Sequence, residues 1–376
     1  MTRRGVPALL CALLLTLSLC ACSRSQSGHT SGAAVTGHMD LSYAEQFSVD
    51  YLADGSDLLT IGGKDKYLIL PQGAEPPADP APGTTVLRRP ISKFYLASSS
   101  AADLFLQTGA LSTVRFTGTA AANWRIPEVR AAVESGDILY AGKYSAPDFE
   151  LLLSEGCDLA VENTMLYHSP DIQEQLERVG IPVLVERSSY EPHPLGRVEW
   201  VKVYGLLTGH EAEAEQFFSE QVNRLSDVED LAPTGKTVAF FHISTSGAAV
   251  VRRPGDYVSK MIALAGGAYV FDDLEASDSD ARSTLNMQME SFYAGAREAD
   301  ILIYNSTIDG ELNTLSDLLA KSSLLKDFKA VRTGNVWCTE QNMFQKTSAA
   351  AGMITDLHAV FTDTAEKDLT FLHRLT

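Results

Sequence analysis

The residues that could catalyse a reaction or bind a metal ion are scattered along this chain of 376 residues. Its eight histidines show no paired spacing and no histidine-rich loop, whereas a zinc or manganese carrier needs several such ligands together. Ser244–Gly247 lacks the leading glycine of a nucleophile elbow, and the sequence has no phosphate-binding lysine loop, dinucleotide fingerprint or metalloprotease helix motif. We therefore expect a binding protein rather than an enzyme, with no catalytic residues, no metal site and no cofactor of its own.

The first segment of the chain carries a different chemistry, that of lipid attachment. Two arginines precede an apolar run from Ala8 to Leu19, which is too short to span a bilayer. The run closes in Leu-Cys-Ala-Cys, which resembles the bacterial lipobox, and we place the lipid on Cys22 because a small alanine precedes it. This predicts a lipoprotein signal peptide over residues 1–21 and a protein held by a diacylglyceryl cysteine on the outer face of the bacterial cell membrane. An ordinary secretory leader is the alternative.

Charge and cysteine content narrow the class of protein further. The formal net charge is −18, from 30 Lys and Arg against 48 Asp and Glu, so the surface repels nucleic acid and helps to keep an exported protein soluble. Beyond the leader only Cys157 and Cys338 are left. We expect two separate buried thiols, and a disulfide between them is the alternative.

A tether and a small β region precede the larger part of the chain. Residues 22–40 are small and polar with almost nothing to bury, which predicts a flexible tether between lipid and domain. Residues 41–85 hold two alternating apolar runs around Gly62–Lys66, which predicts a β-hairpin extension. The proline-rich stretch Pro71–Pro82 then reads as a semi-extended connector.

The rest of the chain predicts an α/β fold of two Rossmann-like lobes with parallel sheets. Short β-rich runs alternate with helical stretches over residues 86–195, and the pattern restarts over residues 233–376. Residues 196–232 between them form linker helices, and Glu211–Leu225 has the apolar stripe of an amphipathic helix. We expect a single long linker helix, which permits little hinge bending. The expected strands are Phe94–Ala97, Thr113–Phe116, Ile138–Tyr140, Leu159–Val161 and Pro182–Val185 in the first lobe, and Thr237–Ile243, Ile301–Tyr304 and Asn335–Cys338 in the second.

Several stretches of these lobes occur in a recognisable order: Asp148–Leu153 with Cys157–Val161, then Gly180–Val185, Leu264–Phe271 and Ala299–Ile303. In this order they resemble the family of substrate-binding proteins that serve ABC importers of iron-siderophore complexes, haem and cobalamin. The resemblance covers roughly residues 86–370. Ser188–Trp200 further resembles a subgroup of iron-complex binders, which also carries an extra N-terminal hairpin region.

The resemblance implies an extracytoplasmic protein that captures a metal chelate and delivers it to an ABC permease dimer with its ATPase subunits. In this family a glutamate at a helix start of each lobe docks onto permease arginines, and the matching positions are Glu150 and Glu290. Two carboxylates on rigid lobes would give a two-point register. Ordinary helix-start glutamates stabilised by the helix dipole are the alternative. We expect a monomer; a surface ligand sensor or scavenger, or a zinc or manganese binder of a related importer class, is the alternative for the whole protein.

Ligands of βαβ folds bind outside the carboxyl ends of the strands, and this rule locates the expected cleft. The segments there carry hydroxyls, amides, aromatic rings and a few cations, which suit a ferric chelate, haem or a corrinoid. One of His168, His193 and His242 could serve as an axial ligand to haem iron. For any single residue, ordinary loop structure is the alternative to ligand contact. The candidate ligand-binding residues are Ser98, Ser99, Lys143, Tyr144, Asn163, Met165, Arg187, Arg252, Tyr304, Asn305 and Trp337.

Overall fold

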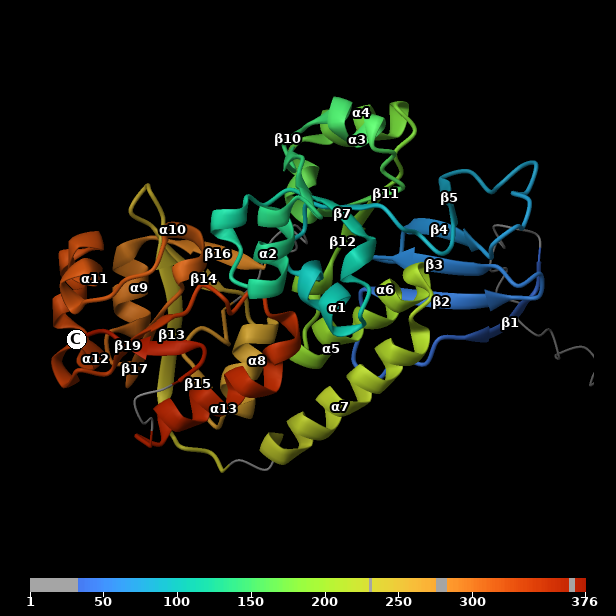
Figure 1. Ribbon diagram of the computed structural model, residues 1–376. Helices are drawn as coiled ribbons and strands as arrows, with labels where there is room; N and C mark the ends of the chain where they lie inside the picture. Colours follow the sequence, from blue (N-terminus) through green and yellow to red (C-terminus); the bar gives the residue numbers. More distant parts are fainter. Residues whose placement is uncertain (1–32, 230–231, 275–282, 365–368) are drawn as a thin grey trace, which may run out of the picture.

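The computed structural model describes residues 33–229, 232–274, 283–364 and 369–376. The predicted signal peptide, the lipid-bearing Cys22 and the tether as far as residue 32 lie outside these ranges. The described chain forms an N-terminal sheet, a first lobe and a second lobe (Figure 1). No helix in this part of the chain is long and apolar enough to cross a membrane.

The N-terminal sheet has five strands in the order β1-β2-β3-β4-β5. The expected hairpin is its centre, where β3 and β4 are antiparallel and Gly62 and Gly63 take the left-handed conformation that the turn requires. Two edge strands were not foreseen, because β1 and β5 are short and half-exposed; β1 therefore ends the tether earlier than the expected residue 40. The strands are β1 (Val35–His38), β2 (Phe47–Leu52), β3 (Asp57–Ile61), β4 (Asp65–Leu70) and β5 (Thr84–Arg88).

The first lobe is built on an all-parallel sheet in the order β12-β11-β6-β7-β8, as expected. Helices cover both faces: α1 and α2 pack on one, and α3 and α4 pack on the other. The elements are β6 (Phe94–Leu96), α1 (Ala101–Gln107), β7 (Val114–Thr117), α2 (Pro127–Ser135), β8 (Leu139–Tyr140), α3 (Phe149–Ser154), β11 (Leu159–Asn163), α4 (Pro170–Arg178) and β12 (Val183–Glu186).

The second lobe has a mixed sheet in the order β16-β14-β13-β17-β18-β19, with β15 beside the start of β13. Its expected strands β13, β17 and β18 are parallel. Strands β14 and β19 run antiparallel to them, and β16 pairs antiparallel with β14; these three strands were not foreseen. The strands are β13 (Thr237–Ile243), β14 (Ala249–Arg252), β15 (Ala268–Tyr269), β16 (Thr284–Met287), β17 (Ile301–Tyr304), β18 (Val336–Thr339) and β19 (Leu372–Arg374). The helices that the site and the linker involve are α8 (Tyr257–Leu264), α9 (Met289–Ala296), α10 (Ser306–Asp309) and α13 (Ala350–Phe361).

Three consecutive helices, α5 (Pro194–Glu199), α6 (Val201–Thr208) and α7 (Glu211–Glu229), connect the lobes. The long helix α7 has 19 residues and packs on α6 at one end and on α13 of the second lobe at the other. Gly205 allows the first contact, since a Cβ there would lie 2.7 Å from the Cβ of Ala214. At the lobe interface the guanidinium of Arg197 lies 4.1 Å from the ring centroid of Tyr257. Helix α7 is the predicted long linker helix, but the connection is not a single helix, because the shorter α5 and α6 precede it.

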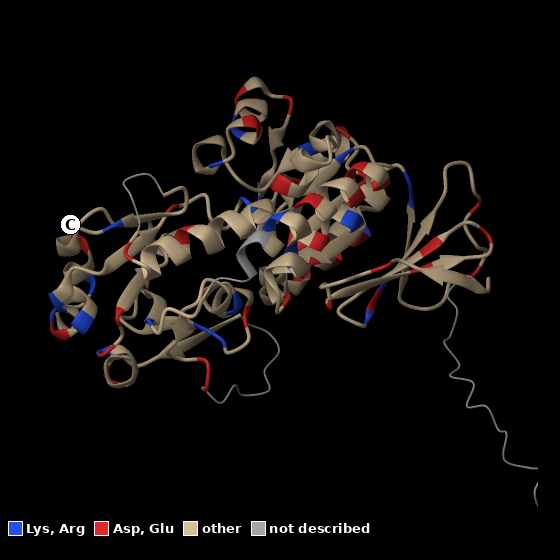
Figure 2. Ribbon diagram, turned by 90° about the horizontal axis from the view of Figure 1, so that it is seen from below, with Lys and Arg blue, Asp and Glu red and all other residues tan. Residues whose placement is uncertain are grey.

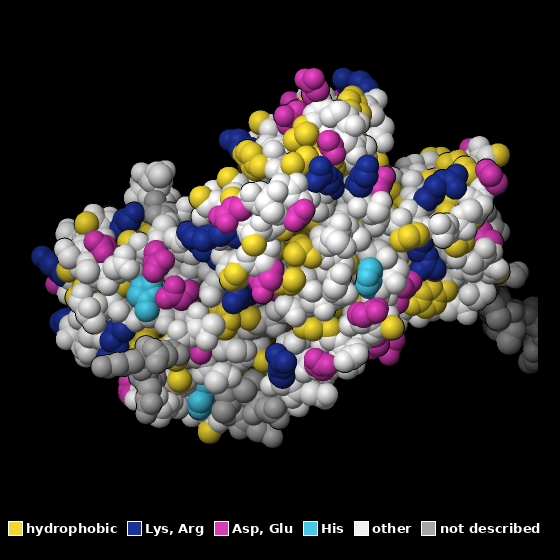
Figure 3. Space-filling model, viewed as in Figure 1, with side chains coloured by type: hydrophobic (Ala, Val, Ile, Leu, Met, Phe, Trp, Pro, Cys, Tyr) yellow, Lys and Arg dark blue, Asp and Glu magenta, His cyan; other side chains and the backbone are white. Residues whose placement is uncertain are grey.

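Acidic residues occur along the ribbon in all three parts of the molecule rather than in one segment (Figure 2). On the face shown in Figure 3, basic and acidic side chains are interspersed with small hydrophobic groups, and no broad basic patch occurs on that face.

Candidate functional site

A cavity of about 370 Å³ lies between the two lobes, where strands of both sheets end. Ser99 and Thr119 follow β6 and β7 of the first lobe, while Ser306 and Gln341 follow β17 and β18 of the second. The rule for βαβ folds therefore locates this cavity correctly. Its lining residues are Ser99, Thr119, Asn123, Arg125, Ser306, Thr307, Gly310, Gln341, Phe344 and Gln345.

Hydrogen bonds join the two lobes beside this cavity of about 370 Å³, which we call the smaller cavity. The backbone N–H of Arg125 donates to Oε1 of Gln345 at 2.7 Å, and Nε2 of Gln345 donates to the carbonyl oxygen of Asn123 at 2.9 Å. Further along, the N–H of Ser348 donates to Asp103 Oδ2 at 2.7 Å. A segment of the second lobe is thus bound to α1 and to the loop after β7.

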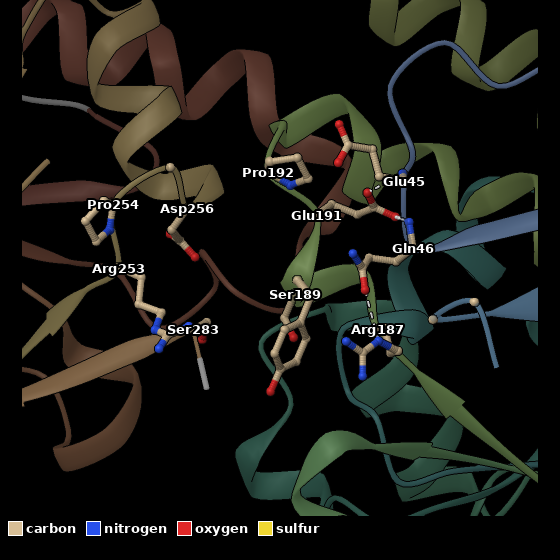
Figure 4. Close-up of a pocket in the computed structure, with 14 residues that line it drawn as sticks. Glu45, Gln46, Arg187, Ser189, Glu191, Pro192, Arg253, Pro254, Asp256 and Ser283 are labelled. Atoms are coloured by element: carbon tan, nitrogen blue, oxygen red, sulfur yellow. Dashed lines mark hydrogen bonds between the residues drawn. The ribbon is translucent and has the colours of Figure 1, made fainter. Parts of the chain in front are cut away.

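A larger cavity, of about 570 Å³, is formed by all three parts of the molecule (Figure 4). The N-terminal sheet contributes the segment before β2 and the β3–β4 turn. The first lobe contributes the segment after β12, and the second lobe contributes the loop between β14 and α8. The lining residues are Glu45, Gln46, Gly62, Gly63, Arg187, Ser189, Tyr190, Glu191, Pro192, Arg253, Pro254, Gly255, Asp256 and Ser283.

Arg187 and Arg253 face this larger cavity from opposite lobes (Figure 4). Nε of Arg187 donates to Oε1 of Gln46 at 3.0 Å, and its guanidinium lies 4.7 Å from the ring centroid of Tyr190. No salt bridge joins Arg187 to a carboxylate of the described residues. Its planar guanidinium can therefore donate two hydrogen bonds to a pair of carboxylate or catecholate oxygens.

Two of the three acidic residues that line the cavity, Glu191 and Asp256, are bonded to protein partners. Glu191 accepts hydrogen bonds from the N–H groups of Glu45 and Gln46 and from Nε1 of Trp200, at 2.7, 3.0 and 2.8 Å. Burial raises the pKa of Glu191, and these three donors oppose that rise. Asp256 accepts two hydrogen bonds from the buried Arg252. The cavity therefore offers Arg187 and Arg253 to an anionic group of a ligand, and the exposed Glu45 also lines it.

Three of the sequence-predicted residues lie at these cavities or support them directly. Ser99 lines the smaller cavity and Arg187 lines the larger one. Asn305 caps α10 by accepting from the N–H of Thr307 at 3.1 Å, which positions the Ser306–Thr307 wall of the smaller cavity. Ser98 is buried next to Ser99 in the first lobe, where its hydroxyl donates to Glu186 at 3.0 Å.

The structure places three other predicted residues in the interior of the second lobe. Arg252 is buried in β14, with Nε and Nη2 at 2.8 and 2.5 Å from the carboxylate oxygens of Asp256, and the next residue, Arg253, lines the cavity instead. Tyr304 is fully buried in β17 against the edge of Phe241. Trp337 is buried in β18, and its Nε1 donates to Asn335 at 2.7 Å. These side chains belong to strands, whereas the cleft is lined by residues that follow strands.

The remaining predicted residues lie on the first lobe but line neither cavity. Lys143 is exposed in a two-residue strand, and Tyr144 packs beside the core under α3. The side chain of Asn163 accepts from the N–H of Met165, whose own side chain is 49% exposed. None of the three histidines considered as axial ligands is among the residues that line the two cavities.

The two predicted docking glutamates occupy equivalent places in the two lobes. Glu150 lies in the first turn of α3 and Glu290 in the first turn of α9, and both are exposed. The aspartate that ends each segment holds the first strand of its lobe: Asp158 accepts from the N–H of Lys93 at 3.1 Å, and Asp300 from the N–H of Thr237 at 2.8 Å. The two lobes therefore share this arrangement of helix and strand around the predicted docking residues.

Sequence reasoning missed the contribution of the N-terminal sheet, namely Gln46, Gly62 and Gly63. No local signal marks these residues, because they meet Arg187 only through a contact between segments more than 120 residues apart. Arg253 stands next to the predicted Arg252, but the strand that it follows, β14, was not foreseen.

The chain matches the model of a protein family described as periplasmic binding protein over residues 95–342. It is 25% identical over 316 residues to an uncharacterized lipoprotein of Methanocaldococcus jannaschii, covering 80% of this chain and 77% of that one. Two solved structures share its fold. An ABC-type Fe3+-hydroxamate transport system of Saccharomonospora viridis has a TM-score of 0.57 and 17% identity, covering 72% of this chain and 93% of that one. A periplasmic haem-binding protein of Vibrio cholerae has a TM-score of 0.56 and 17% identity, covering 73% and 99%. At these identities the two structures establish the fold alone.

Proposed function

Because this chain belongs to the periplasmic binding protein family, we propose that it captures a metal chelate outside the cytoplasm and delivers it to an ABC permease. The ligand is an iron-siderophore complex, haem or a cobalamin-like corrinoid. The chain serves as a binding protein and not as an enzyme, it is held to the membrane by a lipid on Cys22, and it works as a monomer with a permease dimer and its ATPase subunits.

The observation that carries this proposal is the cavity of about 570 Å³ between the lobes, with Arg187 and Arg253 on opposite sides. Its volume lies within the range of about 300–1,000 Å³ that is usual for small-molecule sites. Arginine forks bind carboxylate and catecholate oxygens in pairs, so two of them on facing lobes suit a chelate with acidic groups at its edge. The neighbouring cavity of about 370 Å³ adds hydroxyls and amides for a larger ligand.

Delivery is the part of the proposal that separates this protein from a sensor or scavenger. Glu150 and Glu290 are exposed in the first turns of helices on different lobes (Figure 1). Carboxylates in such positions can form salt bridges with arginines of two permease subunits at the same time. Charge complementarity also speeds and orients the encounter.

Replacing Glu150 and Glu290 together by alanine tests this. We expect the double variant to bind its ligand as the wild type does, while uptake through the cognate permease in proteoliposomes falls at least tenfold. Glu128→Ala with Glu213→Ala is the matched control, since these are also exposed first-turn glutamates. Unchanged uptake by the Glu150/Glu290 variant, with ligand binding intact, would show that these residues do not dock.

A further inference from the structure

The segment just before β2 is bound to the first lobe through an unusual set of hydrogen bonds. Five consecutive backbone N–H groups, those of residues 42–46, donate to two buried carboxylates. Glu199 accepts from Ser42, Tyr43 and Ala44 at 2.9, 2.8 and 2.8 Å, and Glu191 accepts from Glu45 and Gln46 at 2.7 and 3.0 Å.

Burial of the two carboxylates costs free energy, and the hydrogen bonds from residues 42–46 offset that cost. Glu199 is 0% and Glu191 is 1% exposed. A buried carboxylate is tolerated when hydrogen-bond donors or a cation neutralise it. The donors of residues 42–46 supply most of that compensation, and Nζ of Lys202 lies 3.3 Å from Glu199 Oε1. The N-terminal sheet is therefore a fixed part of the first lobe.

Other residues of the Ser188–Trp200 stretch serve the same contact. The ring of His193 stacks on Tyr43 with centroids 4.6 Å apart, and the ring of Trp200 meets the edge of Phe47 at 5.2 Å. Gly196 admits the segment, since a Cβ there would lie 2.9 Å from the carbonyl oxygen of Tyr43. The stretch thus forms a socket, that is, a binding surface for the N-terminal sheet. This gives a physical reason for a chain to carry both the Ser188–Trp200 stretch and the N-terminal sheet.

The socket also determines what faces Arg187 at the larger cavity. It fixes the backbone of Gln46, whose side-chain oxygen accepts from Arg187 Nε, and the carbonyl of Gln46 accepts from the N–H of Gly62 at 2.8 Å. A Cβ on Gly62 would lie 3.1 Å from Arg187 Nε, so the turn closes against one edge of the guanidinium. The other edge points into the open cavity (Figure 4).

We propose that the N-terminal sheet is a permanent third wall of the ligand cavity, and that Gln46 is a positioning residue that turns Arg187 toward the acidic groups of an anionic chelate. Arg253 approaches the same cavity from the second lobe. This inference rests on the proposed function and adds to it a charge class for the ligand and a role for the N-terminal sheet. Only Arg187 and Arg253 touch the ligand's acidic groups; Gln46 acts through Arg187.

The test uses the processed chain and four probes of different charge: haemin and a ferric tris-catecholate, which are anionic, cationic ferrioxamine B and neutral cyanocobalamin. For the anionic probe that binds, we expect Gln46→Ala to weaken affinity roughly fivefold. The variant loses the hydrogen bond from Arg187 Nε to Gln46, which orients the guanidinium. Gln46→Glu should weaken affinity further, because the new carboxylate pairs with Arg187 and competes with the ligand. Ser48→Ala, on the exposed side of β2, is the matched control and should bind as the wild type.

The outcomes separate this inference from the proposed function. All variants should keep the thermal midpoint of the ligand-free wild type, since Gln46 contributes its backbone, not its side chain, to the socket. If Arg187→Ala loses the anionic probe while both Gln46 variants bind as the wild type, the third wall is wrong and the proposed function stands. If the wild type binds only cyanocobalamin or ferrioxamine B, the charge class is wrong. If the wild type binds none of the probes, the proposed function itself fails.

Discussion

Arg252 and Arg253 show what sequence reasoning can and cannot decide at the scale of single residues. The sequence predicted Arg252 as a ligand contact without predicting the strand β14 that carries it, and consecutive side chains of a strand point to opposite sides. Arg252 points inward and pairs with Asp256 four residues later, whereas Arg253 lines the cavity. The spacing of four residues between Arg252 and Asp256 is compatible with an ion pair. The pairing becomes evident only when Arg252 is known to end a strand and Asp256 to precede a helix.

Glu162 is a second residue whose role only the structure reveals. Its side chain is 0% exposed in β11, and neither of its carboxylate oxygens has a hydrogen-bond partner within the described part of the chain. Ala160 packs under α3 and α4, so by alternation Glu162 faces the same apolar layer. Burial raises the pKa of Glu162 from 4.5 to about 8. The folded protein therefore favours the protonated form.

This predicts a pH-dependent penalty that Glu162→Gln removes. The penalty is absent below about pH 4.5, where the carboxyl is protonated in both states, and it grows as pH rises toward 8. We expect the variant to be more stable than the wild type by about 4 kcal/mol at pH 8 and equally stable at pH 4. Urea unfolding at pH 4, 6 and 8 measures this, with the exposed Glu174→Gln as control. Parallel pH profiles for wild type and Glu162→Gln would contradict it.

At the scale of elements, the βαβ pattern of the first lobe was predictable and the N-terminal sheet was only partly so. Buried parallel strands such as β11 and β12 begin with apolar runs, Leu159–Val161 and Val183–Val185, so they stand out between amphipathic helices. Strands β1 and β5 are short and half-exposed, and their partners decide their structure. The socket could not be predicted from the sequence, because the N–H groups that bind Glu199 lie about 155 residues earlier in the chain.

The socket makes its own prediction, which requires no ligand. Glu199→Gln replaces one acceptor oxygen by an NH2 group that faces backbone donors, so we expect the free energy of unfolding to fall by roughly 2–4 kcal/mol. Amide hydrogen exchange should accelerate at residues 42–44 and stay unchanged in β13. Glu220→Gln, on the exposed side of α7, is the control. Unchanged protection of residues 42–44 in Glu199→Gln would mean that the carboxylate does not hold the segment.

At the scale of the whole molecule, the single covalent link through α7 is reinforced by packing. Helix α7 contacts α6 and α13, α5 contacts α8, and hydrogen bonds from Gln345 and Ser348 tie the second lobe to the first. These contacts oppose wide hinge opening, as the linker helix suggested from sequence. Ligand entry then depends on small movements around the two cavities rather than on separation of the lobes.

The central claim is that an anionic metal chelate is held between Arg187 and Arg253, and calorimetric titration tests it most directly. The wild type should bind haemin or a ferric tris-catecholate with micromolar or tighter affinity. Arg187→Ala with Arg253→Ala should bind the same probe at least 100-fold more weakly, because two charged contacts are lost. Arg178→Ala, an exposed arginine of α4, is the control and should bind like the wild type. Failure of the wild type to bind either probe, or equal affinity of the wild type and the double variant, would contradict the claim.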